Sequence, residues 1–146
     1  MSPKGIMTVA RHYFVDQTLS AFKEGAIIQQ NKAIAQRYFE DIWNKRNPAA
    51  IDELAAAAVV GYAPDATIQG ADALRQRVAM GLADDSEAHF TIEDVIAEGD
   101  KVCVRWMYRH SVKATGKQAA TTGMHLFRIA SGKIEEFWVN MNDPGA

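Results

Sequence analysis

The spacing of apolar residues changes along the chain from a helical period to a strand period, and this change restricts the fold more than any other feature. Between residues 31 and 45, Ile34, Tyr38 and Ile42 recur every four positions, which is typical of one apolar stripe on an amphipathic helix. Beyond Asp84 and Asp85, β-branched and aromatic residues lie between turn signals in four segments, residues 90–98, 101–112, 118–130 and 133–142. Helices followed by an antiparallel meander predict an α+β fold.

Further helices are expected before the strands. Pro48 is a good first-turn residue, and a second helix is expected to run from it through residues 51–58. A third helix is expected over residues 72–82, and irregular chain with one short strand over residues 61–70. Residues 8–30 predict an extra N-terminal helix. We therefore expect an N-terminal extension, residues 1–30, and one domain, residues 31–146.

Two turn signals predict how the strands pair. Gly99-Asp100 suits a two-residue turn with glycine first, which places Asp94 opposite Arg105 as a cross-strand ion pair. Residues 130–132 suit a three-residue loop, which pairs His125 with Phe137. Alternation then predicts an aromatic-lined concave wall, formed by Val102, Val104, Trp106, Tyr108, His110, His125, Phe127, Phe137, Val139, Met141 and Asp143.

His125 is the most informative candidate for chemistry, because an imidazole among apolar neighbours needs a hydrogen-bond partner or remains neutral. It is either a core histidine held by a backbone or hydroxyl group, which the residues alone favour, or a general acid/base or donor to a substrate. The second role needs a carboxylate within reach. The predicted register offers Phe137 and Val139 instead, and Asp143 lies roughly 13 Å beyond Val139 along the strand.

The other polar and aromatic candidates also have two interpretations. His110 ends its strand, where solvent exposure is somewhat favoured over a role in a site. Tyr38, Trp43 and Tyr62 are able to project donors into a cavity, although Tyr38 and Trp43 also fit a plain helical core. No histidine or carboxylate pair has ligand spacing, and no glycine-rich phosphate loop follows a strand. We therefore expect neither a metal nor another cofactor.

Charge and composition exclude other classes of partner. Sixteen Lys and Arg against eighteen Asp and Glu give a net charge of −2, which argues against nucleic acid binding. The single cysteine, Cys103, excludes an internal disulfide. No apolar run is typical of a signal peptide or a membrane span. We expect a cytoplasmic protein that binds no membrane.

Four segments, NKAIAQRYFEDIWNKRN, ALRQRV, FTIEDVIAEGDKVCVRWMYRHS and TTGMHLFRIASGKIEEFWVNMND, together resemble the SnoaL-like polyketide cyclase family of the nuclear transport factor 2-like superfamily. The resemblance covers residues 31–143. It implies a cone-shaped barrel, in which a curved antiparallel sheet is wrapped by three helices around a deep apolar pocket. It also implies a homodimer, since dimers are common in the family.

The family's cyclases close a polyketide ring by an intramolecular aldol step without metal or cofactor, using an aspartate as general acid/base beside a histidine. HLFRI places that histidine at His125, whereas the aspartate position falls on Val139. Many related sequences hold an acid slightly later, near Asn142 and Asp143. The resemblance thus implies His125 as base or donor, assisted by Asp143 or by a water held by Asn140 or Asn142.

The substrate implied is a small apolar or aromatic molecule that contains a carbonyl group. The residues expected to contact it are Tyr38, Trp43, Tyr62, Trp106, Tyr108, His110, Phe127, Phe137, Val139 and Asn140. A cofactor-free cyclase or isomerase is one hypothesis. A non-catalytic binding module is the alternative, because Val139 leaves an apolar wall where the family has an acid. A dimerisation domain with a filled core is the third.

Overall fold

The computed structural model describes residues 3–142, with side chains from residue 14 onward. The chain begins with the helical segments α1 (Pro3–Arg37), η1 (Tyr38–Asn44, a π-helix), η2 (Pro48–Ala50, a 3₁₀ turn) and α2 (Ile51–Leu54). Two short strands and a helix follow, β1 (Ala55–Tyr62), β2 (Thr67–Gln69) and α3 (Ala71–Asp84). The last four strands are β3 (His89–Glu98), β4 (Lys101–Ser111), β5 (Gln118–Ala130) and β6 (Lys133–Asn142). The predicted α+β class is confirmed.

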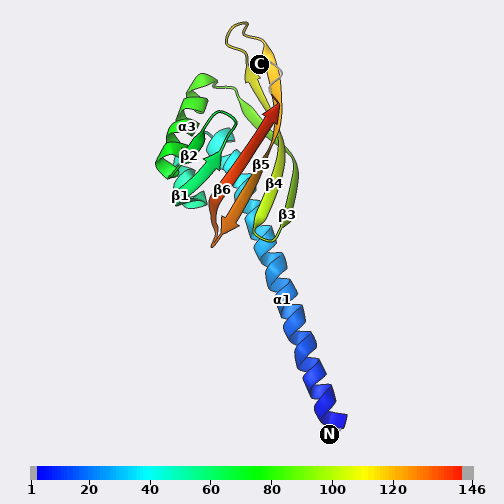
Figure 1. The fold of residues 1–146 in the computed structure, drawn as a ribbon. Helices are drawn as coiled ribbons and strands as arrows, with labels where there is room; N and C mark the ends of the chain where they lie inside the picture. Colours follow the sequence, from blue (N-terminus) through cyan, green and yellow to red (C-terminus); the bar gives the residue numbers. More distant parts are fainter. Residues whose placement is uncertain (1–2, 143–146) are drawn as a thin grey trace.

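The six strands form one sheet in the order β2-β1-β6-β5-β4-β3. The expectation of a wholly antiparallel sheet is wrong, because β1 pairs with β6 in parallel while every other neighbouring pair is antiparallel. The long stretch of chain between β1 and β6, which contains α3 and four other strands, allows β1 to lie beside β6 in the same direction, since parallel neighbours need a long connection. Strands β2 and β3 lie at the two edges, so the sheet is not closed (Figure 1).

The second predicted helix ends earlier than expected. It stops at Leu54, and the alanines that follow belong to β1 rather than to the helix. Alanine favours a helix locally, but pairing with β2 and β6 buries Ala55 and Val59 and overrides that preference. Gly61 is required in this strand, because a Cβ there would lie 2.2 Å from the ring of Phe137.

The expected extra N-terminal helix is not a separate element. One helix runs from Pro3 to Arg37 and continues into η1, so it joins the extension to the stripe predicted over residues 31–45. Figure 1 shows the first part of α1 projecting away from the sheet and the other helices. Side chains become buried from Asn31 and Ala35 onward, where the helix reaches the core.

The turn at Gly99-Asp100 has the predicted register. Gly99 has a φ of 59°, and Asp94 lies opposite Arg105, whose guanidinium donates a 2.7 Å hydrogen bond to its carboxylate. Both side chains of this ion pair are exposed to solvent. The structural interpretation of Asp94 is therefore confirmed.

The loop between β5 and β6 differs from the prediction. Its turn contains two residues, Ser131 and Gly132, both at positive φ, instead of three. The shorter turn moves the pairing by one position, and an irregularity in the ladder between Arg128 and Ile129 moves it by one more, so His125 lies opposite Val139 rather than Phe137. Because the partner shifts by two positions, the side chains keep their predicted face.

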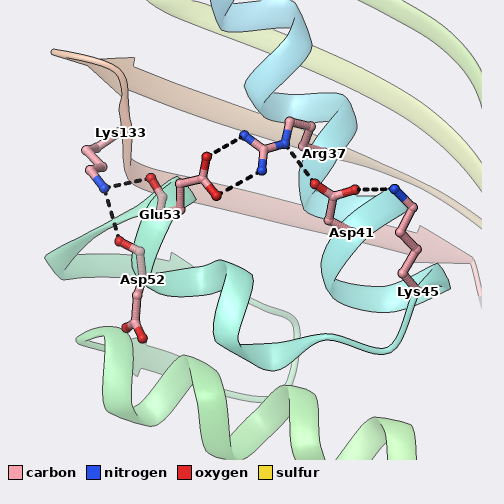
Figure 2. Close-up of polar contacts among 6 residues, drawn as sticks. All are labelled: Arg37, Asp41, Lys45, Asp52, Glu53 and Lys133. Atoms are coloured by element: carbon pink, nitrogen blue, oxygen red, sulfur yellow. Dashed lines mark hydrogen bonds and ion pairs between the residues drawn. The ribbon is translucent and has the colours of Figure 1, made fainter.

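An ionic network joins the end of α1 to α2 and to the β5–β6 turn (Figure 2). The Arg37 guanidinium donates two 3.0 Å hydrogen bonds to Glu53 and one of 2.7 Å to Asp41. These bonds hold the pKa of both carboxyls below their usual range. The ammonium of Lys133 donates to the backbone carbonyls of Asp52 and Glu53 at 3.0 and 2.6 Å. The helical segments are thus anchored to the sheet at this end.

Candidate functional site

A cavity of about 630 Å³ lies between the helical segments and the inner face of the sheet. Its apolar and aromatic wall comes from η1, α3 and four strands, and consists mainly of Tyr38, Trp43, Ile68, Leu74, Phe90, Trp106, Tyr108, Phe137, Val139 and Met141. A cavity of this size argues against the hypothesis of a filled core. It lies within the range of about 300–1,000 Å³ that small-molecule sites occupy.

His125 lies in this wall and is only 6% exposed. The indole nitrogen Nε1 of Trp106 lies 2.9 Å from its Nδ1. An indole N–H only donates, so Nδ1 must carry a lone pair and the proton of the neutral ring belongs on Nε2. Burial lowers the pKa of His125 to about 3. The imidazole is therefore neutral at physiological pH.

Nε2 of His125 is open to the cavity. Its ring stacks on Phe127 and Phe137, with centroids 5.4 and 5.8 Å apart. Among the described residues no protein group forms a hydrogen bond with Nε2. Because no fully buried side-chain nitrogen or oxygen of these residues lacks a partner, Nε2 is not fully buried. The site therefore presents a neutral N–H donor to whatever occupies the cavity.

The acid/base pair considered from the sequence is not present among residues 14–142. No carboxylate there forms a hydrogen bond with His125, and its cross-strand partner is Val139. Asp143, the expected assisting acid, lies outside the described residues. The partner of His125 is an indole instead of the backbone or hydroxyl group expected for a core histidine.

Sequence reasoning missed the Trp106–His125 bond, although a signal for it exists. In the β4–β5 register Trp106 lies opposite Gly123, two positions from His125 on the same face. A Cβ on Gly123 would lie 2.6 Å from the indole ring. The glycine therefore leaves the space that lets the indole lie across β5 and reach the imidazole.

The structure brings seven of the ten predicted contact residues to the cavity, namely Tyr38, Trp43, Trp106, Tyr108, His110, Phe137 and Val139. Three do not line it. Phe127 is fully buried in the core, and Asn140 is exposed on the outer face of β6. Tyr62 stacks on Trp138 at 5.6 Å and is 39% exposed.

Two phenols in the wall remain protonated. Burial raises the pKa of Tyr38 to about 12, although a hydrogen bond with the Trp43 side chain opposes part of this shift. Burial also raises the pKa of Tyr108. Trp43 itself lies close against Gly81, where a Cβ would meet its ring at 2.8 Å. These groups offer a ligand neutral hydroxyls and aromatic surface.

His110 is half-buried and lines the cavity rather than pointing into solvent. Its ring stacks on Tyr108, with centroids 5.3 Å apart, and its Nε2 lies 3.0 Å from the hydroxyl of the buried Thr121. A role in a site, the less favoured interpretation, is thus compatible with its position.

The charged side chains of the wall were not anticipated from the sequence, because they occupy a loop and the polar face of α3. Arg77 donates to both carboxylate oxygens of Asp65, at 2.8 and 3.1 Å, and lowers the pKa of that carboxyl. Asp84 pairs with Lys113 at 2.8 Å. The carboxylates among the described lining residues are therefore already neutralised by cations.

Within the residues that the structure describes, no three histidine, cysteine or acidic side chains gather where they could hold a metal ion. No helix in that part of the chain is both long enough and apolar enough to cross a membrane.

Solved structures with the same fold support this architecture. A protein of Jannaschia sp. CCS1, provisionally named a SnoaL-like polyketide cyclase, is 17% identical, with a TM-score of 0.73 over 80% of this chain and 88% of its own. IdmH of Streptomyces antibioticus, provisionally named a polyketide cyclase, is 21% identical, with a TM-score of 0.70 over 77% of this chain and 92% of its own.

A third similar structure is a Catenulispora acidiphila DSM 44928 protein with a ketosteroid isomerase-like fold, in complex with trimethylamine. It is 23% identical, with a TM-score of 0.66 over 73% of this chain and 83% of its own. At these identities the likeness concerns the fold alone. No curated protein matches the chain significantly. The model of the SnoaL-like domain matches residues 35–137, and the chain therefore belongs to the SnoaL-like family.

Proposed function

We propose that this protein binds a small, mostly apolar molecule in the cavity and holds one acceptor oxygen of that molecule against Nε2–H of His125. The observation that carries the proposal is the hydrogen bond from Trp106 to Nδ1 of His125, because it leaves Nε2 as a donor. Burial of this N–H donor in an apolar wall costs little free energy when the ligand offers it a neutral acceptor oxygen. A ligand that placed another donor there would leave the N–H unpaired.

The lining indicates the chemical class of the ligand. Aromatic side chains dominate the wall, and the phenols of Tyr38 and Tyr108 are neutral. The carboxylates Asp65 and Asp84 are paired with cations. An aromatic or polycyclic ketone suits this wall, since it combines apolar rings with a single acceptor.

Calorimetric titration of two matched probes tests the proposal. 2-Acetylnaphthalene carries a carbonyl oxygen, and 2-ethylnaphthalene has nearly the same shape without an acceptor. We expect the ketone to bind about tenfold more tightly, which corresponds to one hydrogen bond of about 1.4 kcal/mol. The variant His125→Phe should bind both probes equally. Failure of both probes to bind, or a preference for the ketone that survives in His125→Phe, would overturn the proposal.

Catalysis is the second candidate function, and the donor geometry at His125 favours one form of it. A neutral N–H held against a carbonyl oxygen stabilises the enolate that forms when a proton leaves the neighbouring carbon. Such a step underlies aldol cyclisation and ketone isomerisation. Of the similar structures, one is provisionally named a polyketide cyclase and another is described by its ketosteroid isomerase-like fold. His125 itself is neutral and already accepts at Nδ1, so another group has to remove the proton; Asp143 is our candidate base.

Deuterium exchange separates binding from catalysis. We incubate 2-acetylnaphthalene with the protein in D₂O and follow loss of the methyl protons by NMR. Exchange faster than in buffer, reduced about 100-fold or more in His125→Phe and in Asp143→Asn, supports catalysis with a donor and a separate base. Recovery of unchanged, fully protonated ketone after long incubation supports the binding function alone.

A further inference from the structure

Residues 14–27 form an exposed half of α1, ahead of the part of the helix that reaches the core. Every side chain of residues 14–27 is exposed, and Figure 1 shows this part of α1 running away from the rest of the fold. Helices owe most of their stability in water to packing of an apolar face. The exposed half of α1 therefore lacks what normally stabilises a helix.

An apolar seam runs along this exposed half. Val15, Leu19, Phe22 and Ala26 follow one another at intervals of four, three and four residues. The first three are 53%, 53% and 75% exposed. This 4-3-4 spacing is the narrow pattern of a coiled coil and not the wider stripe of a helix that covers a globular core. The seam fits another helix.

The charges beside the seam indicate which helix it fits. Asp16 and Lys23 are seven residues apart and occupy the same position of the heptad. Neither side chain has an ion-pair partner among the described residues of its own chain. Residues in this position face each other across an antiparallel pair of identical helices, which gives Lys23 an acidic partner. A parallel pair would instead set Lys23 opposite the uncharged Thr18.

We propose that residues 14–30 of α1 bind the same segment of a second copy of this chain as an antiparallel two-helix coiled coil. Val15 of one copy then packs in one layer with Ala26 of the other, and Leu19 with Phe22. Asp16 of each copy lies beside Lys23 of the other, so the twofold axis produces two ion pairs. The two domains project from opposite ends of the helix pair. This interface is independent of the cavity and of its proposed ligand.

Sedimentation equilibrium of the full chain tests the interface. We expect a dimer, whose dissociation constant rises more than 100-fold in Leu19→Glu. Ile96→Glu is the matched control, because Ile96 is equally apolar and 68% exposed but lies on β3. Its dimer should be unchanged. The cooperative urea unfolding of the domain should persist in both variants, since neither side chain is in the core.

A charge swap tests the antiparallel register. Asp16→Lys and Lys23→Asp should each weaken the dimer on the order of tenfold, because each replaces two attractions by two repulsions. The double variant should restore the dissociation constant of the unchanged chain. A monomer at hundreds of micromolar, a dimer broken by Ile96→Glu and not by Leu19→Glu, or a double variant as weak as the single ones would each overturn the proposal.

Discussion

The indole N–H of Trp106 donates a hydrogen bond to Nδ1 of His125, across 2.9 Å between two neighbouring strands. Since the indole has no acceptor, this bond decides where the proton of the imidazole lies. The sequence leaves His125 as a base or as a donor, and this bond favours the donor, with its N–H facing the cavity. The proposed ligand chemistry depends on this one contact.

Replacement of Trp106 tests the contact directly. Trp106→Phe keeps an aromatic ring but removes the N–H and leaves Nδ1 of His125 buried without a partner. We expect the free energy of unfolding to fall by about 1–3 kcal/mol, measured by urea denaturation. Trp138→Phe is the control, because the Trp138 indole stacks on the exposed side chain of Tyr62. This variant should lower the free energy of unfolding by less than about 1 kcal/mol. Equal losses in the two variants would contradict the role of the bond.

Acid should destabilise the protein through His125. Burial lowers its pKa to about 3, against an unperturbed value of 6.5. Between these values the unfolded chain binds one more proton than the native chain, so stability falls as pH decreases from 6.5 toward 3. Above pH 6.5 this histidine adds no pH dependence.

The difference is measured by urea denaturation at pH 6.5 and 4.5. Over this interval the free energy of unfolding should fall by about 2–3 kcal/mol less in His125→Gln than in the unchanged chain. The reason is that one proton contributes about 1.4 kcal/mol per pH unit. His89→Gln removes an exposed histidine and should behave as the unchanged chain. If His125→Gln and the unchanged chain lose the same stability, His125 is not buried as a neutral ring.

Gly123 should be essential for the placement of the Trp106 indole. In Gly123→Ala the new methyl group would lie 2.6 Å from that ring and 2.7 Å from the backbone oxygen of Asn140. We expect a loss of about 1–3 kcal/mol in unfolding free energy, together with loss of the preference for 2-acetylnaphthalene.

The control for the added methyl group is Gly25→Ala, where a Cβ meets nothing within 4 Å. Alanine is the better residue inside a helix, so this variant should not lose stability. An unchanged ketone preference in Gly123→Ala would show that the indole does not depend on the glycine.

The sequence predicts the strands well because their signals are local. The Gly99-Asp100 turn and the alternation around His125 are read from neighbouring residues, and the register of Asp94 with Arg105 follows directly. The segment after Leu54 fails for the opposite reason. Its alanines favour a helix locally, but the edge of β6, about 75 residues later in the chain, draws them into the sheet.

The candidate site shows the same limit. The aromatic wall was predicted from period-two alternation, since alternation decides which side chains share a face. The hydrogen-bond partner of His125 was not predicted, because it depends on how the Trp106 indole lies across Gly123. The ion pair of Asp65 and Arg77 was missed because it joins a loop to a helix, and no periodic pattern connects the two.

The protonation state of His125 is the central claim, and NMR of the chain with ¹⁵N-labelled histidine measures it directly. The His125 signals are assigned by their loss in His125→Gln. The account predicts a neutral ring with its proton on Nε2 and a hydrogen-bonded Nδ1 throughout pH 5 to 8. A proton on Nδ1, or an imidazolium that titrates near pH 6.5, would contradict it.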